Sequence, residues 1–580
     1  MSRLFLTCPI FYANAKPHLG HAYTLCLADA WARYARIRGS PSLSPFYVAS
    51  AESPLTKLKK QKPVQTFLSS GLDEHGIKVK QAAVALRKTP QEFCDEIYPL
   101  FKELCEVNSV ALNDFIRTTE ARHCDAVHEF WSRLQKSNTL YESGYSGWYS
   151  VTDEAFYSDW EIKSADSQDQ SAPAACPAES SKRDDTKTKK YVAKETGSPV
   201  EWMEEKNFIF KLSAFKKPLH DWLDSGVFAS ESPSQMIWQK KAHDLVEKAV
   251  DMSVSRSTER LDWGVQVPEH PEQTIYVWVD ALINYLTASG FPSTEKKSPE
   301  APVPSWPPDI QFFGKDILKF HAVLWPALLM AADLPLPRQL ICHHHLLVDG
   351  HKMSKSWNNI LDPFEEQRAL LPSHEHKGDQ PGAASEGLRY VLLRLSLLNA
   401  DAVYNRSLAQ QVINTELVNN VGNLLSRVTS TRLNPTQSVM RITREEAGAV
   451  FNQREEDIRL LDSMDVLAAA FDESWWCQLQ PHAAAEQVLS MVHQTNALLD
   501  RHKPWDHNSE VEREYVISLC AESLRLAGIL LQPVVPTYAK CLLRRLGVYQ
   551  PPGETIKERL KDKLFWSLGP DEGPLLRRLS

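Results

Sequence analysis

The chain has 580 residues, of which 43% are hydrophobic and 24% charged, and its formal net charge is −8. This length exceeds what one hydrophobic core fills, so we expect about two to four globular domains and an ordered chain. The acidic balance excludes a general nucleic-acid binder, and a specific RNA partner must dock on local basic and aromatic patches.

The first part of the chain alternates strands and helices. Residues 3–12 predict an apolar strand, followed by a turn at 17–21 and an amphipathic helix that runs through Arg36 and is ended by Gly39. A second strand near Phe67 leads into residues 71–76 and another helix. Polar residues at the ends of such strands are typical of a doubly wound, Rossmann-like parallel sheet, which is an α/β fold.

The remaining chain divides by composition into further units. From 388 onward apolar residues recur at helical spacing, which predicts an α-helical bundle. Two stretches with few large apolar residues, 40–66 and 163–198, are predicted to be loop or disorder. In chain order, the expected units are a first half of a catalytic domain at 1–135 with an extra insert at about 40–66, an inserted connective module at 136–250, the second half of the catalytic domain at 251–387, the α-helical domain at 388–550 and a tail at 551–580.

The ten cysteines and the hydropathy pattern bear on the compartment. No two cysteines form a C-x-x-C pair, so the sequence predicts buried thiols of a reducing compartment without a disulfide framework or a zinc knuckle. No apolar run approaches the roughly 18–20 residues of a membrane span. Residues 4–6 resemble a core strand, so we expect no targeting peptide in this chain.

A first motif, His18-Leu19-Gly20-His21, stands where the first helix begins. The free N–H groups and the positive dipole end of a helix N-terminus favour an anion, and two imidazoles on one face add donors. Gly20 lets a ligand approach the backbone closely. The alternative is two exposed helix histidines with an accidental glycine between them.

A second motif, at 352–356, reads K-M-S-K-S and follows an apolar strand and an Asp-Gly turn. Its two lysines, Lys352 and Lys355, can neutralise the charge that develops on a departing pyrophosphate. The alternative is a solvated basic loop. Because neither G-x-x-x-x-G-K-[ST] nor G-x-G-x-x-G is present, the two motifs together favour ATP binding and catalysis by His18, His21, Lys352 and Lys355.

These two motifs resemble the signatures of the class I aminoacyl-tRNA synthetases. The finer resemblance is to methionyl-tRNA synthetases of the bacterial and mitochondrial type, and it covers nearly the whole chain except 40–66 and 163–198. The segments that carry it are 9–14, 71–78, 115–119, 253–256, 276–285, 314–321 and 325–326. The resemblance implies an ATP-dependent ligase that activates methionine and transfers it to tRNA(Met).

The resemblance also implies a methionine pocket of aromatic and aliphatic side chains with one carboxylate. A thioether packs well at ring edges, and a carboxylate suits the ammonium group of the substrate. For any single aromatic residue, core packing is the alternative. The implied residues are Ile10, Tyr12, Asp73, Trp278, Ala281, Tyr285, Ile317, His321 and Trp325.

Three further positions are implied to read the anticodon of the tRNA: Asn423, Arg427 and Trp505. Proteins recognise single-stranded RNA loops with exposed aromatic rings and polar side chains. The alternative is a capped helix with a surface tryptophan.

The tract 343–345 is His-His-His. Since alternate strand residues point to opposite faces, it is a poor metal site, and the resemblance places His343 near the nucleotide, as part of the ATP site with Gly20.

The resemblance implies Mg²⁺ with ATP and no structural zinc, because Ser150 and Ala155 stand where zinc-bearing relatives have cysteines. It also implies a mitochondrial-matrix monomer without membrane contact, because no appended dimerisation domain is seen. The segment before Asp73 departs from the family in reading Ser70-Gly71-Leu72 and in following the extra insert. Two alternatives stay open: a synthetase for another aliphatic amino acid, and a catalytically impaired tRNA-binding relative.

Overall fold

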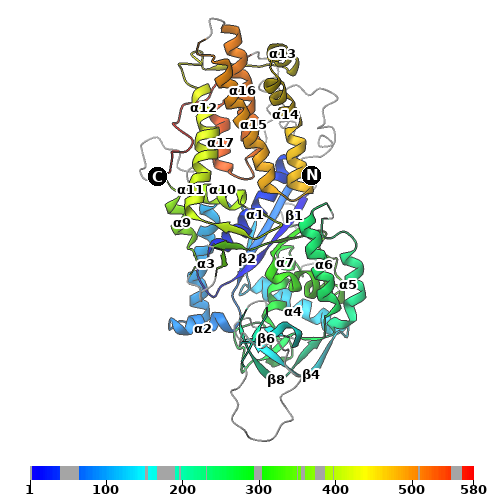
Figure 1. Cartoon of the computed structure of the whole chain (residues 1–580). Helices are drawn as coiled ribbons and strands as arrows, with labels where there is room; N and C mark the ends of the chain where they lie inside the picture. Colours follow the sequence, from blue (N-terminus) through cyan, green and yellow to red (C-terminus); the bar gives the residue numbers. More distant parts are fainter. Residues whose placement is uncertain are drawn as a thin grey trace.

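The computed structural model describes most of the chain. The described residues are 3–38, 64–150, 155–157, 159–165, 190–194, 197–229, 231–292, 304–348, 350–353, 359–371, 386–395, 397–506, 510–549 and 565–579. Residues 40–63 of the predicted insert, most of the 163–198 stretch and Lys355 lie outside them. The loop prediction is wrong at the end of the insert, where residues 65–66 begin β2, and at 191–193, which form β7. In Figure 1 a helical region lies above a central sheet, and a module rich in antiparallel strands lies below it.

The central sheet has five parallel strands in the order β14-β13-β1-β2-β3. The order reverses between β1 and β13, so the predicted doubly wound α/β fold is confirmed. The strands are β1 (Arg3–Tyr12), β2 (Gln65–Asp73), β3 (Asp114–Arg117), β13 (Ile310–Gly314) and β14 (Leu340–His343). Strand β1 has the bounds that the sequence predicts.

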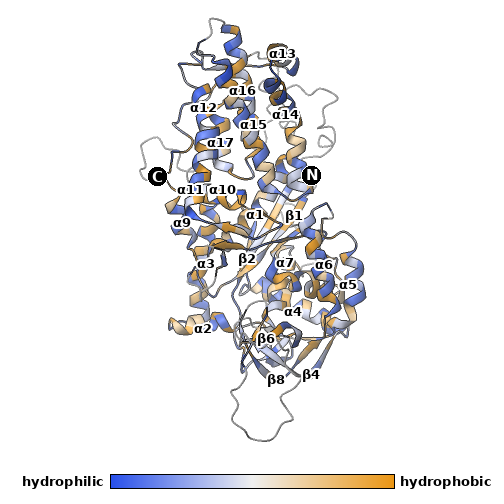
Figure 2. Cartoon of the chain, in the orientation of Figure 1, coloured by the Kyte–Doolittle hydropathy of each residue, from blue (hydrophilic) through white to orange (hydrophobic). Residues whose placement is uncertain are grey.

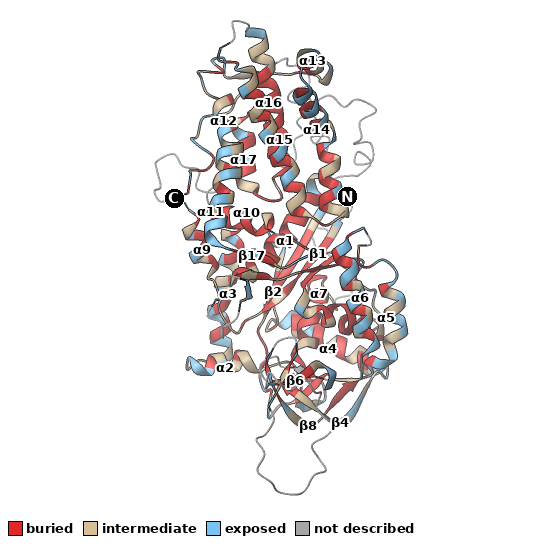
Figure 3. Ribbon diagram, in the orientation of Figure 1, coloured by how far each residue is buried: buried red, intermediate tan, exposed pale blue. Residues whose placement is uncertain are grey.

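Helices cover both faces of this sheet. Successive residues of a strand point to opposite faces, so an apolar strand has side chains to bury on both sides. On one face Phe312 lies 5.7 Å from Trp31 of α1 (Leu19–Ile37), ring centroid to centroid. The next residue, Phe313, packs into the other hydrophobic core together with α7 (Val277–Ala288). The apolar strands at the centre of Figure 2 are accordingly the buried strands of Figure 3.

At Gly71 of β2, the backbones of β2 and β3 approach so closely that only glycine fits. A Cβ atom at this position would lie 2.0 Å from the carbonyl oxygen of Ile116 in β3. No side chain fits there, so this glycine keeps β2 and β3 in register just before Asp73.

The inserted module is built around an antiparallel pair, β4 (Leu140–Ser150) and β8 (Pro199–Phe210), and is joined to the sheet by α4 (Ala121–Lys136). Its remaining elements are β5 (Ala155–Tyr157), η5 (Asp159–Glu161), β6 (Ile162–Ser164), β7 (Tyr191–Ala193), η6 (Leu212–Phe215), α5 (Lys216–Leu223), α6 (Pro233–Glu247) and β9 (Met252–Ser253).

Further elements connect these units. They are α2 (Ile77–Ala85), α3 (Pro90–Val107), β10 (Ser255–Ser257), β11 (Gln266–Val267), β12 (His270–Ile275), η7 (Lys315–Ile317), the π-helix η8 (Phe320–Leu324), α8 (Trp325–Ala331), β15 (Leu346–Val348), β16 (His351–Lys352), α9 (Pro363–Ala369) and β17 (Ala402–Tyr404).

The helical region contains long amphipathic helices that bury their apolar faces against one another. Its elements are α10 (Gly387–Arg394), α11 (Arg406–Val412), η11 (Ile413–Gly422), α12 (Asn423–Val428), α13 (Arg444–Val450), α14 (Glu455–Asp472), η12 (Glu473–Cys477), α15 (Pro481–His502), α16 (Glu510–Leu530) and α17 (Pro536–Arg545). Near the C-terminus, β19 (Phe565–Ser567) pairs with β18 (Ser438–Met440), so this part of the predicted tail packs on the helical region.

A buried ion pair joins the helical region to the sheet. Arg389 of α10 and Asp29 of α1 are both fully buried, and their charged groups lie 2.7 Å apart. Arg389 also donates to the carbonyl oxygens of Pro533 and Val534. The first helix therefore carries His18 at one end and is anchored to the helical region further along. Within the described residues, no helix is both long and apolar enough to span a membrane.

Candidate active site

The carboxyl ends of four neighbouring strands meet at one edge of the central sheet. Tyr12 ends β1, Asp73 ends β2, Gly314 ends β13 and His343 ends β14. Tyr12 and Asp73 are partners in the register of β1 and β2. Ligands of open α/β sheets bind at this edge, where the strand order reverses. Tyr12, Asp73 and His343, which are predicted ATP or methionine residues, therefore lie at the usual ligand-binding edge of the fold.

His18 and His21 cap the N-terminus of α1. The Nδ1 atom of His18 accepts from the backbone N–H of Gly20 at 3.1 Å, and Nδ1 of His21 accepts from the N–H of His18 at 3.2 Å. The two rings stack with centroids 3.7 Å apart. Because each Nδ1 accepts a hydrogen bond, the neutral form of each ring carries its proton on Nε2.

The surroundings of His21 favour that neutral form. Its ring lies 4.8 Å from the ring of Phe11 and 5.2 Å from that of Phe101. Burial, together with the neighbouring His18, lowers the pKa of His21 well below its ordinary value. At neutral pH it therefore offers an N–H donor, not a positive charge, at the anion-favouring end of the helix.

Gly20 brings the first motif against the second. A Cβ atom at this position would lie 2.9 Å from Cε1 of His18 and 3.5 Å from Cε of Met353. Strand β16 ends at Lys352, whose backbone pairs with Leu347 of β15. The K-M-S-K-S segment therefore starts beside the two imidazoles, although Lys355 is outside the described part of the chain.

His343, predicted to belong to the ATP site, contacts α1. Its Nε2 lies 3.1 Å from Oγ1 of Thr24, and its Nδ1–H donates to the carbonyl oxygen of His344 at 2.8 Å. Burial lowers the pKa of His343 to about 4, so the ring is neutral. The neighbouring histidines diverge, since His344 reaches Asp401 and His345 reaches Asp316.

The predicted methionine residues differ in exposure, five being partly exposed and four buried. Trp278 stacks on Phe320 with ring centroids 3.7 Å apart, in nearly parallel planes. The partly exposed residues are Ile10, Tyr12, Asp73, Trp278 and Ile317, and the buried ones are Ala281, Tyr285, His321 and Trp325.

His321 is held in one tautomer at the buried side of this group. Its Nδ1–H donates to the carbonyl oxygen of Ile317 at 3.1 Å, and its Nε2 accepts from the hydroxyl group of Tyr285 at 2.7 Å. Burial lowers the pKa of His321 to about 4. Trp325 packs behind Tyr285, with ring centroids 6.1 Å apart, and is itself fully buried.

Two of the three predicted anticodon residues lie on α12, and the third follows α15. Asn423 is exposed at the start of α12, and Arg427 follows one turn later. The guanidinium carbon of Arg427 lies 5.4 Å from the ring centroid of Trp505, which is 44% exposed. Asp500 forms a 2.5 Å ion pair with Arg427. The structure thus brings two of the three into contact.

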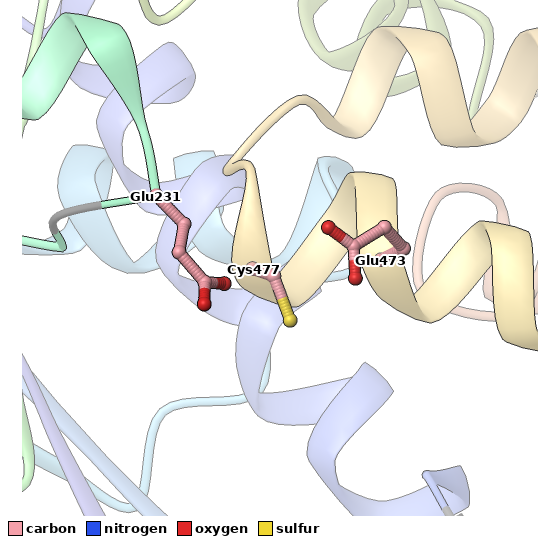
Figure 4. A group of neighbouring side chains, drawn as sticks. All are labelled: Glu231, Glu473 and Cys477. Atoms are coloured by element: carbon pink, nitrogen blue, oxygen red, sulfur yellow. The ribbon is translucent and has the colours of Figure 1, made fainter.

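Among the described residues, one group of three metal-ligating side chains has its ligand atoms within 4.8 Å of one another: Glu231, Glu473 and Cys477 (Figure 4). It contains no residue of the ATP or methionine sites. In the inserted module, Ser150 pairs with Ala155 across β4 and β5, and neither residue offers a thiolate.

Comparison with known proteins identifies the family. A family model described as tRNA synthetases class I (M) matches residues 4–53 and 54–429. The chain belongs to this family. The human mitochondrial methionine–tRNA ligase is 36% identical over 608 residues, covering 100% of this chain and 91% of that protein. A probable mitochondrial methionine–tRNA ligase of Neurospora crassa is 34% identical and covers 94% of this chain and 79% of its own length.

A solved structure shares the architecture. The methionyl-tRNA synthetase of Mycobacterium tuberculosis bound by methionyl-adenylate superposes with a TM-score of 0.79 at 31% identity, covering 99% of this chain and all of that one.

Sequence reasoning did not single out three side chains of this synthetase that touch predicted site residues. Phe320 stacks on Trp278, Met353 lies beside Gly20, and Thr24 contacts His343. Phe320 and Met353 belong to the quoted motifs, so the motif itself was the available signal. Thr24 stands on α1 one turn after Gly20, and only the helical spacing could have indicated it.

Proposed function

We propose that this synthetase is a methionine–tRNA ligase that serves mitochondrial translation. It uses ATP to convert methionine to methionyl-adenylate and then transfers the methionyl group to tRNA(Met). The observation that carries the proposal is the edge shared by β1 and β2, where Tyr12 lies opposite Asp73 and the backbone N–H of Ala13 donates to the carbonyl oxygen of Asp73 at 2.8 Å. The carboxylate for the substrate's ammonium group thus stands next to the loop that leads to His18.

In the activation step, the carboxylate of methionine attacks the α-phosphorus of ATP and pyrophosphate leaves. Binding on one edge of the sheet holds nucleophile and phosphorus in line. His18 and His21 donate from Nε2–H to phosphate oxygens, and Lys352 and Lys355 supply positive charge as the pyrophosphate departs. Gly20 and His343 complete the ATP site.

The nitrogen donors of this site suit phosphate oxygens better than a metal ion. Mg²⁺ prefers oxygen ligands and retains several waters, so we propose that it arrives bound to the phosphates of ATP, where it screens their charge. No structural zinc is proposed for the inserted module, because its β4–β5 pair presents Ser150 and Ala155.

Methionine specificity is assigned to the partly exposed group around Trp278, Tyr12 and Ile317. A thioether gains from contact with ring edges and from an aliphatic slot. The neutral His321, fixed by Tyr285, keeps charge out of the pocket, which disfavours charged side chains. Asp73 binds the ammonium group of the substrate.

In the transfer step, tRNA(Met) is recognised at a distance from the chemistry. Trp505 stacks on an anticodon base, and Asn423 and Arg427 hydrogen-bond to base edges. We propose that the protein acts as a monomer in the mitochondrial matrix, without membrane contact. Subcellular fractionation and sedimentation of the purified protein test these two points.

The assay that separates this function from its rivals follows radiolabelled methionine onto tRNA(Met) in the presence of ATP and Mg²⁺. The proposal predicts acid-precipitable methionine that depends on both ATP and tRNA. A tRNA-binding relative without catalytic activity would retain tRNA on a filter but would form no methionyl-tRNA. A synthetase for another amino acid would charge a different tRNA with that amino acid.

A further inference from the structure

A buried carboxylate in α7 has no part in the steps above. Asp280 is 1% exposed and lies between Trp278 and Ala281 in the sequence. At about 100° per residue, it occupies a different face of the helix from Trp278. A buried carboxylate is costly unless hydrogen bonds hold its charge, so its partners indicate what it does.

Two imidazoles from distant segments meet at this carboxylate. Nδ1 of His75 lies 2.7 Å from Oδ2 of Asp280, and Nε2 of His123 lies 3.0 Å from Oδ1. Burial raises the pKa of the Asp280 carboxyl, but the two imidazoles lower it by more, so its pKa lies well below the ordinary value. The carboxylate is therefore ionised and accepts from both rings.

His123 belongs to α4 and contacts two residues of α7. Besides Asp280, it contacts Oγ1 of Thr287 at 2.9 Å through Nδ1. This contact packs α4 against α7, which lie next to each other in Figure 1. Helix α4 carries none of the residues assigned to methionine or ATP.

His75, in contrast, belongs to the segment that presents Asp73. Glu74, the next residue after Asp73, is held by two other segments: its side chain forms a 2.7 Å ion pair with Arg117, and its carbonyl oxygen accepts from Nε1–H of Trp263 at 2.6 Å. The bond from His75 to Asp280 ties this segment to α7, the helix of Trp278 and Ala281.

We propose that Asp280 is a positioning residue for methionine recognition: through His75 it holds the Asp73 segment against α7, so that the ammonium-binding carboxylate and the thioether-binding side chains keep a fixed separation. The inference rests on the proposed methionine pocket. It assigns Asp280 no contact with the substrate.

The test measures KM for methionine and for ATP in methionine-dependent ATP–pyrophosphate exchange. Asp280→Asn leaves one acceptor where two are needed, and His75→Phe keeps a ring but removes the donor. Both should raise KM for methionine on the order of tenfold, the effect of losing a hydrogen bond to a charged group, and leave KM for ATP within about twofold. His123→Phe should leave KM for methionine within about twofold, although it removes an equivalent buried bond.

His75→Asn supplies a rescue, because its amide nitrogen can take the place of Nδ1. It should return KM for methionine to near the wild-type value. Asp457→Asn is the matched control. Asp457 is also buried and accepts from His502 at 2.7 Å and from Arg501, but it lies in the helical region.

A wild-type KM for methionine in Asp280→Asn would overturn the inference. So would equal increases in His75→Phe and His123→Phe, since a general packing defect would not distinguish them. If Asp280→Asn fails to show a cooperative thermal transition, the comparison of the two histidine variants decides. Absence of methionine-dependent exchange in the wild-type protein would instead reject the proposed function itself.

Discussion

Met353 of the second motif lies over Gly20 of the first, with its Cε atom 3.5 Å from the position that a Cβ on Gly20 would occupy. More than three hundred residues separate the two in the sequence. The contact brings the start of the lysine segment to the helix N-terminus that carries His18 and His21, which is the arrangement that the proposed ATP site requires.

Gly20→Ala is expected to lower the exchange rate. The new methyl group would lie 2.9 Å from Cε1 of His18 and 3.0 Å from its Nδ1, so the ring must leave its bond with the N–H of Gly20. Loss of one positioned donor costs about 10²–10³ in rate. Gly144→Ala is the control, because a Cβ there meets nothing within 4 Å. Equal exchange rates in the two variants would contradict the role given to Gly20.

Lys355→Ala should reduce methionyl-adenylate formation by about 10²-fold or more, because it removes a charge that acts on the departing pyrophosphate. Methionine itself should bind nearly as before, since the proposed role of Lys355 is toward ATP. Single-turnover adenylate formation and calorimetric titration with methionine measure the two effects. Unchanged adenylate formation would exclude Lys355 from catalysis.

Methionine affinity should be nearly independent of pH from 8 down to 5.5. Burial lowers the pKa of His321 to about 4, so the ring stays neutral over this range and its protonation weakens binding only as the pH falls through about 4. A ring with an ordinary pKa of about 6.5 would raise Kd roughly tenfold at pH 5.5. Calorimetric titrations across this range measure Kd, and the tenfold rise would contradict a neutral His321.

Trp505→Ala should raise KM for tRNA(Met) in aminoacylation and leave pyrophosphate exchange unchanged. Stacking of a base on an aromatic side chain contributes about 1–3 kcal/mol, which corresponds to roughly 5-fold to 150-fold. Trp160, 39% exposed in the inserted module, provides a surface tryptophan as control. An equal effect of Trp160→Ala, or none of Trp505→Ala, would contradict anticodon stacking by Trp505.

The periodicity of apolar residues along the sequence predicted individual strands and helices. The bounds of β1 and the run of α1 through Arg36 follow from apolar periodicity, and the structure confirms them. Helix α1 starts at Leu19, inside the turn predicted at 17–21, because the His18 and His21 side chains cap its first turn. The roles of the predicted site residues stay predictions. What no local pattern could give is the meeting of His75, His123 and Asp280, because their contact depends on how three distant segments pack. Likewise, the three residues 343–345 are chemically identical, and only their different partners separate His343 from its neighbours.

ATP–pyrophosphate exchange by the purified protein, with each of the twenty amino acids in turn, tests the proposed activation of methionine most directly. We expect rapid exchange with methionine and exchange at least about 10²-fold slower with every other amino acid, because the proposed pocket around Trp278 and His321 suits an uncharged thioether. Exchange that is fastest with leucine or isoleucine, or absent with all twenty, would contradict this proposal.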